Sequence, residues 1–173
     1  MKTWKKIVLA LAAVPLLVIA FSAAYLIRHS MSPAKPFTVN GPEARDHVLV
    51  ATQGSAYKDA VVQGVTARLG ARGAYVSVVD VGALGDVREA EWSAIVVIHT
   101  WEGGKPPPVV KAFVDRVSAR DKLVVLTTSG DGDKHMDGVD AITSASALAN
   151  APSHADEIAR RVEKLLTPSG PKT

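Results

Sequence analysis

The sequence contains no cysteine, and this absence removes several classes of function at once. Disulfides, thiolate-bound zinc, iron–sulfur clusters and cysteine nucleophiles all need that side chain. Aromatic residues make up only 5% of the 173 residues, and the formal net charge is +3. The lysines and arginines are spread along the chain and form no arginine-rich run, so we expect no nucleic-acid partner.

The motifs of several common enzyme classes are missing as well. The chain has no G-x-S-x-G nucleophile elbow, no H-E-x-x-H zinc motif and no G-x-x-x-x-G-K-[ST] nucleotide loop. No nucleophile and base stand at a recognisable spacing, so we expect no catalytic residues. Any chemistry would then come from a bound cofactor.

The segment TSGDGDKHMDGVD, residues 128–140, resembles a calcium loop because it is rich in aspartate. In such a loop, counted from Asp131, the sixth residue is a sharp-turn glycine and the twelfth is a bidentate glutamate. Met136 and Ile142 occupy these two positions. We therefore expect no metal site.

One long apolar run opens the chain. It extends from Ile7 to Ile27, carries no charge and is preceded by three lysines. A helix of about 20 residues spans the roughly 30 Å hydrocarbon core of a bilayer. We therefore expect residues 1–28 to form a single-pass membrane anchor; the alternative is a cleaved signal peptide with a small-residue site at residues 22–24. The lysines favour a cytoplasmic N-terminus and an extracytoplasmic domain, with the opposite orientation left open.

Composition divides the rest of the chain into three parts. Residues 29–46 are rich in proline, serine and lysine, which predicts a semi-extended spacer. Residues 47–167 carry the apolar patterns of a folded domain, and residues 168–173 are expected to be a disordered tail.

Apolar runs of strand length recur through the domain. Strands are expected at residues 47–52, 75–81, 95–98, 123–127 and 139–143. Helical patterns lie between or after these strands. The apolar face of the first helix holds Val61, Val65 and Leu69, and that of the second holds Val110, Phe113, Val114 and Val117. The last helix is expected to begin at Ser153 and to bury Ile158, Val162 and Leu165. This alternation predicts a parallel sheet with helices on both faces.

Ligands of open parallel sheets bind at the carboxyl ends of the strands. The residues that follow the first, third and fourth strands are therefore the candidate site. They are Thr52, Gln53, Gly54, Ser55 and Ala56; Thr100, Trp101, Gly103 and Gly104; and Ser129, Gly130 and Asp131.

Three segments follow these strands: TQGSAY, HTWEGGKPPPVVKAFVDRV and TTSGDGD. Flavodoxins have similar segments in the same order and at similar distances along the chain. The domain therefore resembles the flavodoxin-like family from His47 to about Leu166. The resemblance implies an α/β, doubly wound, five-stranded parallel sheet of order 2-1-3-4-5 and a noncovalent FMN. It also implies that the first segment faces the FMN phosphate and that the other two lie on either side of the flavin ring.

The chain departs from the family in the first segment. Flavodoxins usually have T-x-T-G-x-T there, whereas this chain has Gly54 and Tyr57 at the second and third hydroxyl positions. An ordinary strand-to-helix turn is the alternative to a phosphate loop. Lys58 could add charge to a phosphate, but we interpret it as a solvated helix residue, and we interpret His99 as a structural histidine.

Trp101 has two interpretations. It could stack on a flavin, with Gly103 and Gly104 letting the backbone approach the ring edge. It could instead fold onto its own domain, a membrane surface or a partner.

VDAITSAS, residues 139–146, is similar to the D-x-x-S-G-A-T motif at which another family of membrane redox proteins attaches FMN covalently. Ser144 stands in place of the glycine, and Ser146 in place of the acceptor threonine. We interpret the similarity as coincidental.

Two functions remain open. The first is a membrane-tethered electron carrier that binds FMN and serves an unidentified redox partner. The second is a flavin-free binding or assembly module at the membrane surface.

Overall fold

The computed structural model describes residue 4, residue 11 and the ranges 13–22 and 31–167. The chain divides into two compact units, residues 1–30 and residues 31–173. Residues 13–22 of the first unit are helical. Within the described ranges, no helix is both long enough and apolar enough to cross a membrane. Part of the expected anchor, and all of the expected tail at residues 168–173, lie outside the described residues.

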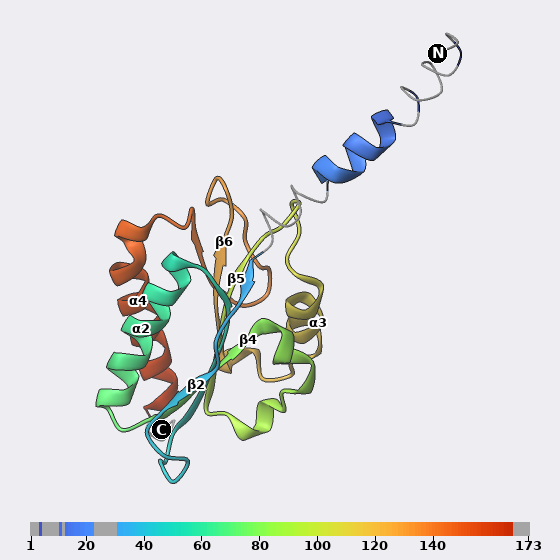
Figure 1. Ribbon diagram of the computed structural model, residues 1–173. Coiled ribbons are helices and arrows are strands. Elements are labelled where there is room, and N and C mark those ends of the chain that lie inside the picture. Colours follow the sequence, from blue (N-terminus) through green and yellow to red (C-terminus); the bar gives the residue numbers. More distant parts are fainter. Residues whose placement is uncertain (1–3, 5–10, 12, 23–30, 168–173) are drawn as a thin grey trace. The chain divides into compact units, whose positions relative to one another are not determined.

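The second unit is built on a mixed β-sheet (Figure 1). Five of its strands are parallel and follow the spatial order β4-β3-β5-β6-β7, which confirms the predicted order 2-1-3-4-5. They are β3 (His47–Gly54), β4 (Tyr75–Asp80), β5 (Ala94–Thr100), β6 (Leu123–Thr128) and β7 (Asp140–Ser144).

Two further strands lie in the segment expected to be a spacer. β1 (Ser32–Pro33) pairs antiparallel with the end of β3, and β2 (Phe37–Val39) pairs antiparallel with β4. The spacer prediction for residues 29–46 was therefore wrong over their described part, and the sheet has seven strands instead of five. The pairing partners lie far along the chain, so local composition carried no sign of them.

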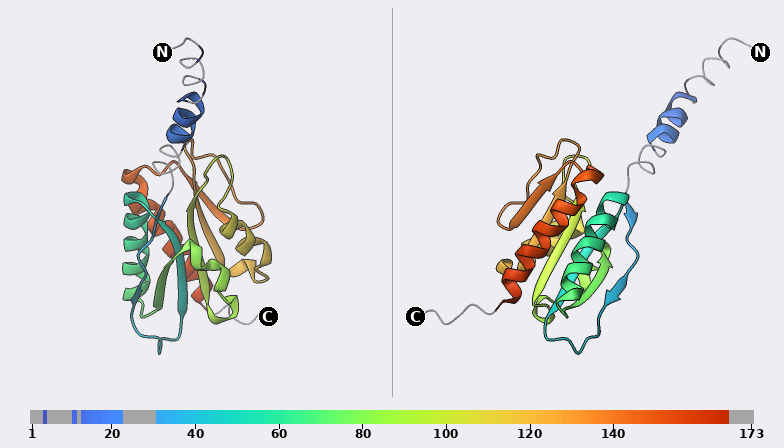
Figure 2. Two further views of the ribbon diagram at one scale, coloured as in Figure 1. Left: turned by 45° about the vertical axis from the view of Figure 1, so that its right-hand side comes forward. Right: turned by 90° about the vertical axis from the view of Figure 1, so that its left-hand side faces the viewer.

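Helices cover both faces of the sheet. α2 (Ala56–Ala71) and α4 (Ala151–Leu166) lie side by side on one face, while α3 (Pro108–Arg116) and the 3₁₀ turn η1 (Val81–Asp86) cover the other (Figure 2). The remaining 3₁₀ turns, η2 (Glu89–Glu91), η3 (Arg120–Lys122) and η4 (Leu148–Asn150), are short connections. Proline stands at the start of α3, where a helix tolerates it best.

The last helix differs in detail from its prediction. It begins at Ala151, two residues before Ser153, and no side chain caps it. Leu165 is 38% exposed, and the neighbouring Leu166 lies on the buried face instead. The expected apolar positions Ile158 and Val162 are fully buried.

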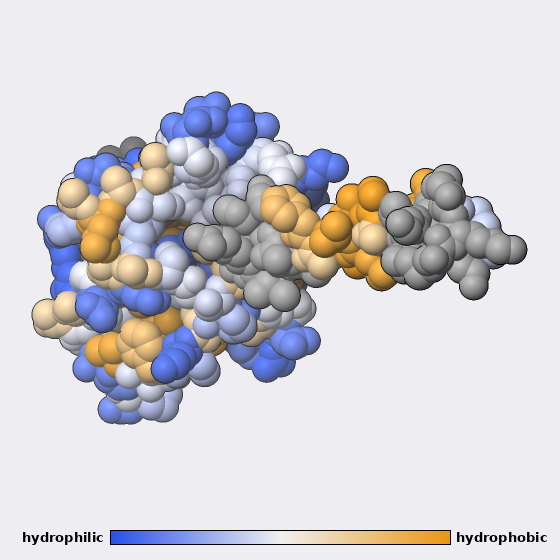
Figure 3. Space-filling view, turned by 45° about the horizontal axis from the view of Figure 1, so that its top comes forward, coloured by the Kyte–Doolittle hydropathy of each residue, from blue (hydrophilic) through white to orange (hydrophobic). Residues whose placement is uncertain are grey.

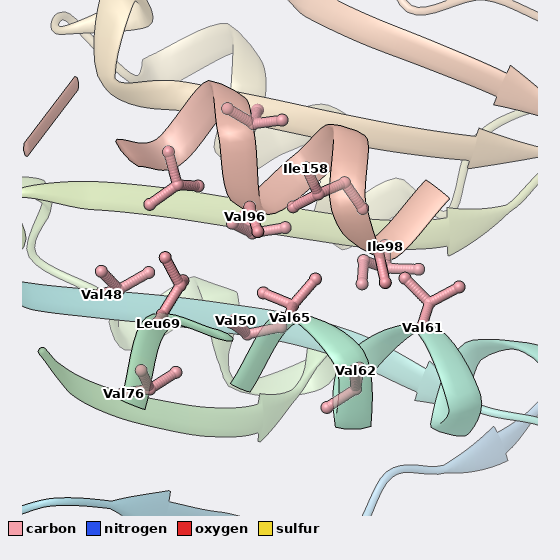
Figure 4. Close-up of a cluster of buried hydrophobic side chains, with 14 of the residues drawn as sticks. Val48, Val50, Val61, Val62, Val65, Leu69, Val76, Val96, Ile98 and Ile158 are labelled. Atoms are coloured by element: carbon pink, nitrogen blue, oxygen red, sulfur yellow. The ribbon is translucent and has the colours of Figure 1, made fainter. Parts of the chain in front are cut away.

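Branched aliphatic side chains form the core between α2, α4 and the sheet. In Figure 4, Val61 and Val65 of α2 approach the strands from one side, and Ile158 of α4 lies over β5. Val96 and Ile98 of β5 face this cluster, while the intervening side chains of β5 face the α3 side. Burial on both faces fixes the strand register and brings the carboxyl ends of the parallel strands to one edge.

Candidate functional site

The three loops predicted to form the site do meet at the carboxyl edge of the sheet. They follow β3, β5 and β6, which are adjacent strands in register with one another. The first loop runs from the end of β3 into α2, the second is the segment before α3, and the third lies between β6 and β7. The strand pairing thus positions all twelve predicted residues on or beside this edge.

Gln53 joins the first loop to the second. Its side-chain Oε1 accepts a hydrogen bond from the Thr100 main-chain N–H at 2.8 Å, and its Nε2 donates to Glu102 Oε1 at 3.1 Å. Gln53 is only 7% exposed. Its amide is therefore engaged within the protein on both sides.

The second and third loops are also bonded to each other. The Trp101 N–H donates to the Thr128 carbonyl at 2.8 Å, and the hydroxyls of Thr100 and Thr128 lie 2.7 Å apart. The Ser129 N–H donates to the Ser144 carbonyl at 3.1 Å. These bonds extend the sheet ladder into the loops. Gly130 and Asp131, which follow, are exposed.

Trp101 folds onto its own domain. Its side chain is half-buried and packs against the apolar cluster beneath α3, which includes Val110 and Met136. The indole Nε1 is buried and has no hydrogen-bond partner within the described residues. The ring also lines a small groove of about 240 Å³ with Lys111 and Arg120.

Gly103 and Gly104 form a tight turn. Their φ angles are 59° and 76°, and Glu102 and Lys105 on either side exchange two main-chain hydrogen bonds of 2.9 and 3.2 Å. Positive φ at both central residues is the geometry of a type I′ turn, for which glycine is favoured. The turn alone accounts for the glycine pair.

Ser55 begins α2. Its side-chain oxygen accepts a hydrogen bond from the Lys58 main-chain N–H at 3.2 Å, the usual pattern of a helix N-cap. The Thr52 hydroxyl is buried and donates to the Gln53 carbonyl at 3.0 Å. Ala56 is the exposed first residue of the helix. The first loop therefore presents one partly exposed hydroxyl, that of Ser55.

β1 covers the backbone of this first loop. Ser32 pairs with Gly54, and Pro33 pairs with Gln53. A Cβ atom placed on Gly54 would lie 3.0 Å from the Ser32 carbonyl oxygen, tighter than nine in ten real Cβ contacts. Glycine therefore lets the two backbones approach closely without displacing β1.

A groove lies between this N-terminal segment and α2. Its volume is about 460 Å³, and Ser32, Pro33, Gly54 and Ser55 are among its lining residues. Val62 and Val78 supply buried apolar side chains on its floor. The groove brings solvent to the start of α2.

Lys58 is buried, so its interpretation as a solvated residue was wrong. Its side chain is 1% exposed, and its Nζ donates to Met31 Sδ at 3.2 Å. Burial lowers the pKa of Lys58 from 10.5 to about 8, against the opposing effects of Glu102 and Asp59. Sequence reasoning had a signal for this burial, because Lys58 stands three residues before Val61 on the helical repeat.

His99 lies on the α3 side of the same edge and is completely buried. Its Nε2 lies 3.2 Å from the Thr127 hydroxyl, while its Nδ1 is buried without a hydrogen-bond partner within the described residues. Burial lowers the pKa of His99 from 6.5 to about 4; the Lys58 charge lowers it further and the Thr100 backbone opposes the shift. These contacts support the structural role inferred from the sequence.

Sequence reasoning missed a second polar cluster, between α2, β7 and α4. The Tyr57 hydroxyl donates to Ser144 Oγ at 3.2 Å and lies 2.7 Å from His154 Nδ1. Burial raises the pKa of Tyr57, which keeps its hydroxyl protonated. Tyr57 stands 87 positions before Ser144 and 97 before His154, so no local motif in the sequence indicates this cluster. The described residues contain no group of three or more His, Asp or Glu side chains placed to hold a metal.

No family model and no curated protein sequence matches the chain. Among solved structures, it is similar to the metal-soaked Flv1 flavodiiron core of Synechocystis sp. PCC6803, with 10% identity and a TM-score of 0.52 over 72% of this chain and 36% of that chain. The match thus spans about a third of that protein. Oxidised flavodoxin 2 of Bacillus cereus matches at 12% identity and TM-score 0.49, over 69% and 98% of the two chains.

General stress protein 14 of Treponema denticola, solved in complex with FMN, matches at 12% identity and TM-score 0.31, over 70% of this chain and 95% of that one. At these identities the likeness concerns the fold alone. Together with the strand order, it shows that the domain has an α/β flavodoxin-like fold.

The residues predicted to hold FMN do not fit that cofactor as they are arranged. Gln53 and Thr100 are bonded to each other, and β1 lies against Gly54. Trp101 packs beneath its loop, and two glycines close a turn. Gln53, Thr100 and Trp101 thus have their polar groups bonded within the three loops or buried, while Ser55, Gly130 and Asp131 remain at least partly exposed.

Proposed function

We propose that residues 31–167 form a flavodoxin-like binding module that works without a bound flavin. The observation that supports this proposal is the bridge from Gln53 to Thr100 and Glu102, which ties the first loop to the second. We expect an FMN between these loops to break that bridge and to displace β1 from Gly54. Breaking buried hydrogen bonds without replacement costs free energy that binding must then supply.

A fluorescence titration tests this proposal. FMN added to the full-length protein in detergent should keep its fluorescence, and the purified protein should show no flavin absorption band. Trp101→Ala should give the same result as the wild type. Stoichiometric quenching of FMN by the wild type would overturn the flavin-free function.

An FMN-dependent electron carrier is the second candidate. It is favoured by the strand order and by the meeting of the three loops at one sheet edge. In that case Trp101→Ala should weaken FMN binding by about 1–2 kcal/mol through the loss of ring stacking. The same titration therefore separates the two candidates.

We also propose that the N-terminal segment holds the module at a membrane, with the domain outside the cytoplasm. The uncharged run from Ile7 to Ile27 and the three preceding lysines support this location. Large apolar side chains are exposed in the described part of the run, as the orange colouring of Figure 3 illustrates. They include Leu11, Leu16, Ile19 and Phe21, which are 64–76% exposed.

Fractionation tests the location. The full chain should stay in the membrane pellet after an alkaline carbonate wash, whereas the double variant Leu16→Lys/Ile19→Lys should be released. A shortened N-terminus in the mature protein, seen by intact-mass spectrometry, would identify a cleaved signal peptide and contradict the anchor. A reporter that functions only outside the cytoplasm, fused after Thr173, should be active.

A further inference from the structure

We infer that the groove beside α3 binds a free α-amino acid with an apolar side chain, whose carboxylate pairs with Arg120 and whose ammonium group pairs with Asp137. The inference rests on the proposed function, because it names a ligand for the flavin-free binding module. The groove has a volume of about 240 Å³, and both charged residues line it.

The groove lies between α3 and the loop that joins β6 to β7. α3 contributes Val114 and Asp115, the loop contributes Met136 and Asp137, and Trp101 comes from the second loop. None of the first-loop residues 52–56 lines it. The groove is therefore separate from the place at the start of α2 where an FMN phosphate was expected.

The floor of the groove is apolar. Val114 and Met136 are buried, and they belong to the same cluster that the Trp101 ring packs against. Small-molecule sites combine such a lining with a few polar groups that fix the orientation of the ligand. Pockets for drug-sized ligands occupy roughly 300–1,000 Å³, so a groove of about 240 Å³ suits a smaller molecule, of the size of one amino acid.

Two opposite charges share the rim of this groove without pairing. Arg120 and Asp137 both line it, and both are exposed. Among residues 31–167, no carboxylate lies within 4 Å of the Arg120 guanidinium, and no cationic nitrogen lies within 4 Å of the Asp137 carboxylate. The other charged pair of the lining, Lys111 and Asp115, is bonded to itself at 2.6 Å. The groove thus offers one cation and one anion to a ligand.

The backbone at Gly138 positions both charges. Arg120 Nη1 donates to the Gly138 carbonyl at 3.4 Å, and a Cβ atom on Gly138 would lie 2.7 Å from the same nitrogen. Asp137 is the preceding residue of the same turn. A guanidinium has five N–H donors in a planar fork that matches a carboxylate, so one long bond to a carbonyl leaves most of them for a ligand.

An α-amino acid carries the two complementary charges on one carbon atom. Its carboxylate can accept from Arg120 and its ammonium can donate to Asp137, while its side chain covers Val114 and Met136. A simple carboxylate would leave Asp137 without a partner, and an amine would leave Arg120 without one. The combination of charges on the rim and the apolar floor therefore favours the amino acid.

Titration calorimetry of the full-length protein in detergent tests the site with four probes. L-Leucine should bind, whereas glycine, N-acetyl-L-leucine and L-leucinamide should each bind about three- to tenfold more weakly. Glycine lacks the apolar side chain, the acetylated probe lacks the ammonium group, and the amide lacks the carboxylate. Differences of this size are expected for partly exposed charged hydrogen bonds and for a small apolar contact.

Two variants assign the charges. Arg120→Gln should bind L-leucine and L-leucinamide equally, and Asp137→Asn should bind L-leucine and N-acetyl-L-leucine equally, because each variant removes the partner of the missing charge. Arg45→Gln and Asp86→Asn are the matched controls, at exposed positions outside the groove, and should keep the wild-type preferences. Loss of one preference at a time is a result that general destabilisation would not produce.

A ¹H–¹⁵N spectrum of the wild type locates the ligand without any substitution. The amide signals of Asp137 and Gly138 should move on addition of L-leucine and move less with glycine. Unmoved signals at the solubility limit of L-leucine would overturn the inference. So would equal binding of L-leucine, N-acetyl-L-leucine and L-leucinamide by the wild type, or wild-type preferences in both Arg120→Gln and Asp137→Asn.

The flavin-free function fails by a different result. Stoichiometric quenching of FMN would overturn that function, whereas binding at the α3 groove is judged by the preferences among the four amino-acid probes, with or without FMN.

Discussion

Gln53 accepts a hydrogen bond from the Thr100 main-chain N–H at 2.8 Å, across the ends of the two central strands. Both residues were predicted to follow apolar strands and to face a cofactor for that reason, whereas they lie at the ends of β3 and β5. In the structure they contact each other, and the same amide reaches Glu102. At this part of the carboxyl edge, the Gln53 amide is therefore bonded to the protein itself on both sides.

Gln53→Ala should lower the free energy of unfolding by about 1–3 kcal/mol, because the Thr100 N–H and the Glu102 carboxylate both lose a partner. Urea denaturation monitored by circular dichroism measures the change. Gln63→Ala, at an exposed position on α2, is the control and should change stability by less than about 0.5 kcal/mol. Equal effects of the two substitutions would show that the bridge contributes nothing.

The sequence was sufficient to predict the parallel strands and their order. β5, AIVVIHT, is buried at every residue except the last, and such continuous apolar runs mark strands covered on both faces. β1 and β2 escaped prediction because runs of two and three residues show no periodicity. They exist because β4 has a free edge, where β2 pairs, and because β3 extends two residues beyond its pairing with β4, where β1 pairs. Both are properties of the folded sheet.

The place of the site could be predicted, but its internal contacts could not. Strand order alone puts Thr52, Thr100 and Ser129 at one edge. The contact of Lys58 with Met31 depends instead on how the chain folds between two residues that are 27 positions apart. For Lys58 the helical repeat did carry a warning, because the spacing that buries Val61 and Val65 also buries position 58.

Gly54→Ala should loosen the pairing of β1 with the end of β3. The added methyl group would lie 3.0 Å from the Ser32 carbonyl oxygen and 3.1 Å from that of Pro33, so β1 must shift. We expect a loss of about 1–3 kcal/mol, in the range of overpacking substitutions, and faster hydrogen exchange at Ala34. Gly130→Ala is the matched control, because a Cβ there meets nothing within 4 Å. Unchanged exchange at Ala34 in Gly54→Ala would contradict the close approach.

His99 should make the domain sensitive to acid. Burial lowers its pKa from 6.5 to about 4, so between these values the unfolded chain binds a proton that the folded protein excludes. The free energy of unfolding is therefore unaffected by His99 above about pH 6.5, where the ring is neutral in both states. It decreases as the pH falls from 6.5 towards 4. Between pH 6.5 and 5 we expect a loss of about 2 kcal/mol.

Urea denaturation at several pH values in this window measures the loss. His99→Gln should flatten most of the dependence, and the remainder should come from His154, whose pKa is also lowered by burial. His135→Gln, at an exposed position, should keep the wild-type slope. A slope that survives in His99→Gln would mean that other groups carry the acid response.

Lys58 should produce the opposite dependence at alkaline pH. Its pKa is lowered from 10.5 to about 8. Below pH 8 the folded protein buries the charged ammonium, which lowers the free energy of unfolding. This destabilisation disappears as the pH rises from about 8 to 10.5, because the folded protein loses the proton first. Stability should increase by about 2 kcal/mol between pH 7 and 9.5, before Tyr57 ionises in the unfolded chain. Lys58→Met should remove the increase, and Lys111→Met should retain it.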